Sequence, residues 1–200
     1  MPLIESNYKP KGWLKYGHLQ TIYPSFFRKI YFGYDERQRI TLSDGDFLDL
    51  DWKRNDNDKL VVLCHGLEGS SSSTYILGMA KHLSDNGFDI LAINYRSCSG
   101  EMNINMRFYH HGATDDLNEV MPHCADYRNI HLMGFSLGGN LALKYVGEDI
   151  FEKPKNLKSV TAFSVPIDLE DCVQEIHKVK NQIYVQNFLI TLKKKVKEKA

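Results

Sequence analysis

The 200-residue sequence lacks an excess of charge, because 25 lysines and arginines are balanced by 25 aspartates and glutamates. Proteins that bind nucleic acid usually carry a basic excess, so we exclude nucleic acid as a partner. The sequence also lacks any apolar run of about 18 residues or more, the length that a membrane-spanning helix requires. Its first residues contain no basic stretch followed by an apolar one. We therefore expect no transmembrane segment and no signal peptide.

Cysteine is scarce, and the four that occur, Cys64, Cys98, Cys124 and Cys172, form no CxxC pair and no metal-ligand spacing. This absence excludes a zinc motif and a disulfide framework of the kind found in small secreted proteins. We expect reduced thiols, no metal and a cytoplasmic location. No internal repeat or low-complexity segment is present.

Charge is unevenly distributed along the chain. Residues 175–200 contain seven lysines and two glutamates, a local charge of +5 that the remainder must offset. The favoured interpretation is the solvated face of a helix, and the alternative is a peripheral contact with a membrane surface.

Short apolar runs alternate with segments of helical periodicity through the middle of the chain. Strands are predicted over 37–42, 46–52, 60–64, 88–94, 130–133 and 157–165, and helices over 74–85, 113–125 and 137–146. The first two strands are joined at Asp44-Gly45, a good hairpin turn. The later alternation predicts an α/β fold with a mostly parallel sheet, flanking helices and N-terminal antiparallel strands.

The ends of the chain follow other patterns. Residues 1–35 are rich in aromatic residues, glycine and proline, and we expect an irregular arm. Apolar residues at helical spacing from Val173 to Val196 predict one or two amphipathic helices. We therefore divide the chain into an arm (1–35), a core (36–170) and the start of a helical cap (171–200). A loop as long as 95–112 is typically functional or mobile.

The motif Gly134-Phe135-Ser136-Leu137-Gly138 lies between a predicted strand and a predicted helix. This is the context of a G-x-S-x-G nucleophile elbow, whose sharp turn leaves room only for glycine on either side of the serine. The turn presents the hydroxyl of Ser136 above the sheet, at a helix N-terminus that favours developing negative charge. Ser136 is the candidate nucleophile. The alternative is a serine in a glycine-rich turn without catalytic use.

A second motif, His65-Gly66-Leu67-Glu68-Gly69, directly follows the first buried strand. Acyl transfer needs two backbone N–H groups that bind the oxyanion, and in this arrangement Leu67 and Leu137 are the candidates. The side chain of His65 is expected to hold the loop by hydrogen bonds. The serines at 70–73 are expected to form a turn and a helix N-cap.

Five segments stand in the order typical of one family: HLQT (18–21), HGLEGS (65–70), NYRSCSGE (94–101), YHHGATDDL (109–117) and GFSLGGN (134–140). Over residues 12–170 the sequence resembles the YheT-like branch of the α/β-hydrolases. The resemblance implies a carboxylic-ester hydrolase acting on short to medium acyl esters or glycerolipids, without a cofactor. It places the nucleophile at Ser136 and the oxyanion loop at Leu67, and it gives loop 96–101 a bracing role.

The sequence departs from the family at the other two members of the triad. In this fold the acid and the histidine follow the serine, yet His177 is the only histidine after Ser136 and lies in a predicted helix. Asp168 is expected to form a turn or belong to the cap. We therefore expect an α/β-hydrolase fold with its C-terminal part missing, and an exposed apolar sheet edge that favours oligomerisation or poor solubility.

Two function classes follow. The first is a serine carboxylic-ester hydrolase of the esterase or lipase type, with the triad acid and histidine absent from this chain. The second is a non-catalytic protein of hydrolase fold that binds a lipid or a partner. Thioesterase or peptidase chemistry on the same elbow differs from the first only in substrate.

Overall fold

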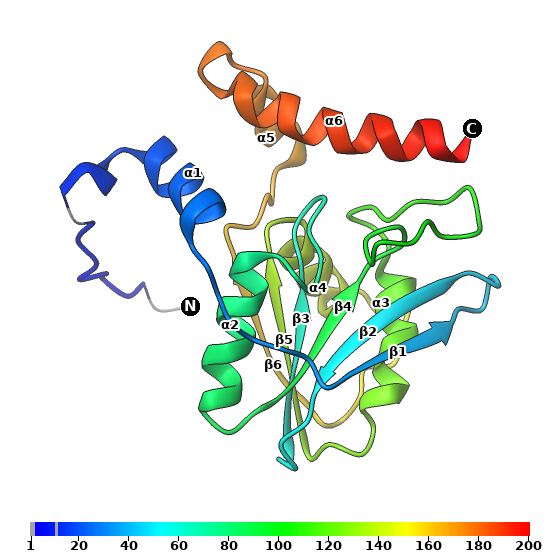
Figure 1. The fold of residues 1–200 in the computed structure, drawn as a ribbon. Coiled ribbons are helices and arrows are strands. Elements are labelled where there is room, and N and C mark those ends of the chain that lie inside the picture. Colours follow the sequence, from blue (N-terminus) through cyan, green and yellow to red (C-terminus); the bar gives the residue numbers. More distant parts are fainter. Residues whose placement is uncertain (1–2, 11) are drawn as a thin grey trace.

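The computed structural model describes residues 3–10 and 12–200, which are built around one six-stranded sheet of order β1-β2-β4-β3-β5-β6 (Figure 1). The strands are β1 (Glu36–Thr41), β2 (Phe47–Lys53), β3 (Lys59–Cys64), β4 (Asp89–Asn94), β5 (Asn129–Phe135) and β6 (Leu157–Phe163). β3 pairs in parallel with β4 and β5, and β5 pairs in parallel with β6. β1 and β2 add the antiparallel pair at the other end. The predicted fold class and strand arrangement are confirmed.

Three helices cover the two faces of the sheet: α2 (Thr74–Asp85), α3 (Thr114–Val120) and α4 (Leu137–Gly147). α2 buries Ile76 and Ala80 in an apolar cluster on one face. α3 and α4 bury Leu117 and Tyr145 in a larger cluster on the other. The predicted helix over 113–125 is an α-helix only to Val120 and continues as a 3₁₀ turn from Met121 to Cys124, where Pro122 cannot donate a helical hydrogen bond.

The long loop between β4 and α3 is fixed to the N-terminal hairpin by buried charge. Arg96 is almost fully buried and forms ion pairs of 2.7 Å with Asp116 and 3.0 Å with Asp46. Asp46 also accepts the backbone N–H of Ile104 at 2.9 Å. The bracing role expected for this loop is confirmed, and its hydrogen bonds hold it against the sheet.

The predicted irregular arm is wrong over part of its length. A 3₁₀ turn spans Gly12–Lys15, and α1 spans Gly17–Phe27. α1 places apolar residues at helical spacing, from Leu19 to Phe27, but it buries none of them. It also carries Pro24, which usually argues against a helix interior.

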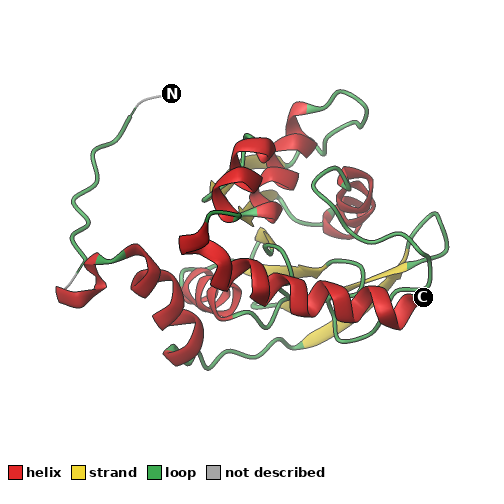
Figure 2. Ribbon diagram, turned by 90° about the horizontal axis from the view of Figure 1, so that it is seen from above, coloured by secondary structure: helices red, strands yellow, loops and turns green. Residues whose placement is uncertain are grey.

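Two further helices, α5 (Leu169–Ile176) and α6 (Gln182–Lys199), lie above the edge of the sheet where the parallel strands end (Figure 1). Seen from above, the long helix α6 runs across the sheet (Figure 2). Most lysines of α6 are exposed as expected, but Lys195 and Lys199 reach Glu68 and Asn103 below it. No helix formed by the described residues has both the length and the apolar character needed to cross a membrane.

The outer edge of β6 is exposed. Among residues 3–10 and 12–200, no strand pairs with β6 on the side away from β5. Large apolar side chains in and after this strand are open to solvent, including Phe163 and Ile167. The exposed apolar sheet edge expected from the sequence is therefore present.

Candidate active site

Ser136 stands at the turn from β5 into α4, with its side chain exposed above the sheet. Its backbone dihedrals are φ 51° and ψ −118°, a conformation that is costly for a residue with a side chain. The strain is held by neighbours: the Ser136 N–H donates to the carbonyl of Phe163 at 2.8 Å. Ser136 is also the N-cap of α4, so its hydroxyl lies at the positive end of that helix.

The two glycines of the motif are required by backbone contacts. A Cβ on Gly134 would lie 2.3 Å from the carbonyl oxygen of Gly138. A Cβ on Gly138 would lie 2.4 Å from the carbonyl oxygens of both Cys64 and His65. The second contact was not foreseen: Gly138 is needed because the end of β3 presses against the start of α4.

That contact brings the loop after β3 directly beside the nucleophile. A Cβ built on Gly66 would lie 3.4 Å from the Cβ of Ser136. Within residues 3–10 and 12–200, the N–H of Leu67 has no hydrogen-bond partner, and neither has the N–H of Leu137 in the uncapped first turn of α4. The arrangement therefore offers two free amides beside the hydroxyl of Ser136.

The imidazole of His65 lies beneath this loop and is fully buried. Its Nδ1 is 2.7 Å from the carbonyl of Gly66, and its Nε2 accepts the N–H of Tyr95 at 3.3 Å. Burial lowers the pKa of His65 to about 4, so the ring is neutral at pH 7. The structural role expected for this side chain is confirmed.

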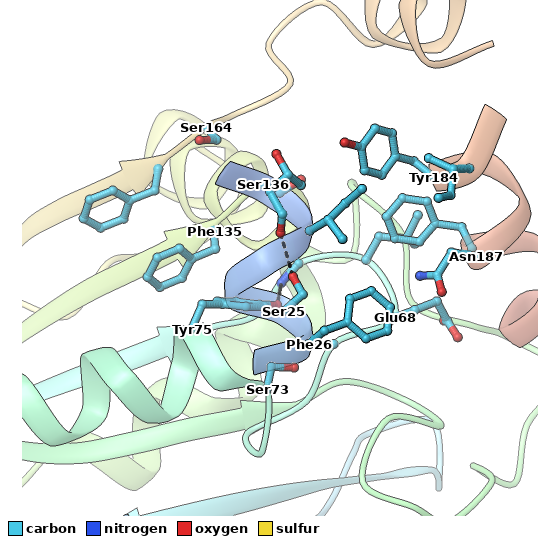
Figure 3. A pocket seen from close by; sticks show the side chains of 18 residues that line it. Ser25, Phe26, Glu68, Ser73, Tyr75, Phe135, Ser136, Ser164, Tyr184 and Asn187 are labelled. Atoms are coloured by element: carbon cyan, nitrogen blue, oxygen red, sulfur yellow. Dashed lines mark hydrogen bonds between the residues drawn. The ribbon is translucent and has the colours of Figure 1, made fainter. Parts of the chain in front are cut away.

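A cavity of about 630 Å³ opens over Ser136. Its floor is formed by the loop after β3 and by the elbow, and Phe135 of β5 lies at its wall (Figure 3). Phe163 of β6 also lines it. Ser25 and Phe26 of α1 close one side, and Tyr184 and Asn187 of α6 close another (Figure 3). The lining is largely apolar, which suits the acyl chain of an ester.

Among the described residues that line the cavity there is no histidine, and Glu68 is the only acid. Glu68 is held in an ion pair with Lys195 at 2.9 Å. His177 is exposed at the end of α5, with Nδ1 2.8 Å from the carbonyl of Val173. Asp168 is the N-cap of α5 and accepts the N–H of Asp171, the turn-forming role expected. Within residues 3–10 and 12–200, neither a base nor its acid is therefore brought to Ser136.

The residues between 59 and 184 match the family model described as "alpha/beta hydrolase fold". The chain is 32% identical to "Putative esterase YheT" of Escherichia coli (strain K12), over 88% of this chain and 53% of that protein. It belongs to the YheT-like branch of the α/β-hydrolase family. It is also 30% identical to human "Phospholipase ABHD3", over 95% of this chain and 49% of that protein. The chain thus spans about half the length of these relatives.

Among solved structures, the α/β-hydrolase chain resembles the Pyrococcus furiosus esterase Pf2001. The TM-score is 0.60 with 22% sequence identity, over 98% of this chain and 67% of that one. At this identity the likeness concerns the fold alone. No group of three His, Cys, Asp or Glu side chains suited to a metal ion occurs in the part of the chain that the structure describes.

Sequence reasoning predicted the helical segment from Val173 to Val196 but not which residues of α1 and α6 line the cavity. Four residues of α1 line the cavity (Thr21, Ile22, Ser25 and Phe26), as do four of α6 (Ile183, Tyr184, Asn187 and Phe188). The two helices meet where Nδ1 of His18 lies 2.8 Å from the hydroxyl of Tyr184. For α1, the family resemblance singled out HLQT at 18–21 without giving it a place, and the helical spacing from Leu19 to Phe27 was a second signal.

Proposed function

We propose that this α/β-hydrolase chain carries the nucleophile and the oxyanion hole of a serine carboxylic-ester hydrolase. The observation that carries the proposal is the position of Ser136. It sits in a strained turn at a helix N-terminus, beside the free N–H groups of Leu67 and Leu137. Such strain has a cost in stability that a scaffold without chemistry does not require.

In the proposed reaction, Oγ of Ser136 attacks the acyl carbon of the ester as a base removes its proton. The carbonyl oxygen becomes an oxyanion, which the amides of Leu67 and Leu137 stabilise. The intermediate collapses to an acyl-enzyme and releases the alcohol, and water then hydrolyses the acyl-enzyme in a second, equivalent addition. Each oxyanion donor contributes about 3 kcal/mol to lowering the barrier.

The base and the acid that orients it are proposed to come from sequence outside these 200 residues. Two observations support this: no histidine lines the cavity within residues 3–10 and 12–200, and the curated relatives are about twice as long. An oxyanion hole and binding alone leave roughly 10³–10⁴-fold catalysis over water in triad-deficient serine proteases. The chain itself is therefore expected to show weak turnover.

Short to medium acyl esters or glycerolipids are the proposed substrates. The apolar walls and a volume of about 630 Å³ suit an acyl chain. The names of two relatives, an esterase and a phospholipase, support the same class.

A non-catalytic role in lipid or partner binding is the second candidate. The absence of a histidine from the described lining of the cavity favours it. In that case the cavity would still bind an acyl chain, but Ser136 would have no special reactivity.

Chemical rescue separates the two candidates. The chain is incubated with a fluorophosphonate probe, with and without imidazole as a substitute base, and labelling is followed by intact mass. The serine hydrolase predicts slow labelling that imidazole accelerates and that Ser136→Ala abolishes. Labelling that is absent under both conditions, or that persists in Ser136→Ala, would reject the assignment of Ser136 as the nucleophile.

A further inference from the structure

The amide of Leu67 lies between two amides that are each bound to a tyrosine hydroxyl. The N–H of Gly66 donates to the hydroxyl of Tyr75 at 2.9 Å. The N–H of Glu68 donates to the hydroxyl of Tyr109 at 2.7 Å. The N–H of Leu67 between them is free within the described part of the chain. The two tyrosines thus fix the backbone on both sides of the one amide that they leave open.

Tyr109 is itself oriented by the residue whose amide it binds. Its hydroxyl donates to Oε1 of Glu68 at 2.7 Å while accepting the N–H of the same residue. Because a hydroxyl has one proton, this donation turns a lone pair toward the amide. Glu68 has a φ of 56°, which is unfavourable for glutamate, and the paired hydrogen bonds with Tyr109 offset that strain.

Because Tyr109 and the side chain of Glu68 are both buried, the hydrogen bonds between them are protected from solvent. Tyr109 is buried, and its ring stacks on that of Tyr95 with centroids 5.5 Å apart. Burial raises the pKa of Tyr109 well above its usual value, so its hydroxyl remains a donor at any working pH. The side chain of Glu68 is only 5% exposed.

The remaining contact of Glu68 comes from α6, which with α1 forms the roof of the cavity. Nζ of Lys195 in α6 donates to Oε1 of Glu68 at 2.9 Å and lies 3.4 Å from Sγ of Cys98. The same helix contributes Tyr184 and Phe188 to the cavity lining. A cavity wall and the loop that carries Leu67 are therefore tied by one buried carboxylate.

We infer that Tyr75, Tyr109 and Glu68 are positioning residues that hold the Leu67 N–H toward the oxyanion, and that Lys195 makes this depend on the docking of α6. The inference rests on the proposed function. It also gives a physical reason for two segments noted in the sequence, HGLEGS at 65–70 and YHHGATDDL at 109–117: Glu68 in one and Tyr109 in the other hold each other by two hydrogen bonds.

The test compares Tyr109→Phe with Tyr34→Phe. Both remove one hydroxyl bound to backbone, but Tyr34 binds the carbonyl of Ser71, away from the Leu67 amide. Amide hydrogen exchange by NMR reports the loop without any chemistry at Ser136. In Tyr109→Phe the Glu68 amide should exchange about ten-fold faster, as expected for one lost hydrogen bond. Tyr34→Phe should leave that amide unchanged.

The imidazole-assisted labelling of Ser136 supplies the second measurement. Tyr109→Phe should lower the maximal labelling rate by roughly 10- to 100-fold, less than the 10²–10³-fold lost when an oxyanion donor is removed outright. The half-saturating probe concentration should stay the same. Glu68→Gln and Lys195→Met should lower the rate in the same way by smaller factors, and Lys195→Arg should restore it.

The outcomes separate the two proposals. If the wild-type chain does not label, the proposed function fails, but hydrogen exchange still decides whether the tyrosines hold the loop. An unchanged Glu68 amide in Tyr109→Phe overturns the inference. The inference is also overturned if Tyr34→Phe lowers the labelling rate as much as Tyr109→Phe does. It is overturned as well if Tyr109→Phe changes only the half-saturating probe concentration and not the maximal labelling rate.

Discussion

The floor and the roof of the cavity differ in how firmly they are built. The floor, formed by residues 64–69 and the Ser136 elbow, is closed by backbone contacts that leave no room for a methyl group at Gly134 or Gly138. The roof, formed by α1 and α6, buries only Val185. Groups that must be placed to a fraction of an ångström therefore lie in the tightly packed core. Groups that would contact the acyl chain of the proposed substrate lie on weakly anchored helices.

The largest effect is expected from a methyl group in the floor. Gly134→Ala places a Cβ 2.3 Å from a backbone oxygen, which no side-chain rotation relieves. We expect a loss of about 4 kcal/mol or more in the free energy of unfolding, or no folded protein. Urea unfolding followed by circular dichroism measures it.

Gly147→Ala, at the end of α4, is the control. Nothing lies within 4 Å of its added Cβ, and we expect a change of less than about 1 kcal/mol in either direction. Equal effects of the two substitutions would mean that the floor is packed no more tightly than the end of α4.

An intermediate effect is expected at Asp46, which holds the loop between β4 and α3 to the N-terminal hairpin. Burial acts to raise the pKa of this carboxyl, but hydrogen bonds from Asn103 and from the backbone N–H groups of Ile104 and Phe47 outweigh it and lower the pKa to about 2. The ionised form is thus stabilised by folding. This stability is complete at neutral pH and is lost as pH falls from about 4 through 2.

Asp46→Asn should therefore lower stability at pH 7 by about 2 kcal/mol and flatten the acid limb of a stability–pH profile. Asp85→Asn is the control, since its exposed pair with Lys81 contributes about 0.5 kcal/mol or less. If the free energy of unfolding of the wild-type chain stayed constant down to pH 2, ionised Asp46 would not contribute the expected stability.

The floor could be predicted from sequence, and so could the helices between Val173 and Val196, but not the contacts that join these helices and α1 to the floor. Strands that are buried on both faces consist of continuous apolar runs, which are visible in the sequence. The elbow is a local motif, and only glycine fits at its two flanking positions without a steric clash. α1 has apolar residues at helical spacing, but Pro24 argues against a helix and the helix buries no side chain. The bond between Glu68 and Tyr109 joins residues 41 positions apart, and Lys195 comes from farther still. Such pairs depend on the folded arrangement, and a lysine-rich helix does not reveal which lysine is used.

The smallest effect on stability, and the sharpest test of the roof, is expected at Phe26. Its side chain is 77% exposed and lines the cavity, whereas the neighbouring Phe27, 67% exposed, does not. Either substitution by alanine should change the free energy of unfolding by less than about 0.5 kcal/mol, as is usual at the surface.

Ligand binding should distinguish the two phenylalanines. An acyl chain in the cavity covers part of Phe26, and losing about 1 kcal/mol of such apolar burial weakens binding roughly five-fold. Fluorescence titration with a dansyl-labelled medium-chain fatty acid should show this loss in Phe26→Ala and not in Phe27→Ala. Equal affinities in both variants would mean that α1 does not contact the acyl chain. A large fall in stability would mean that the roof is as firmly built as the floor.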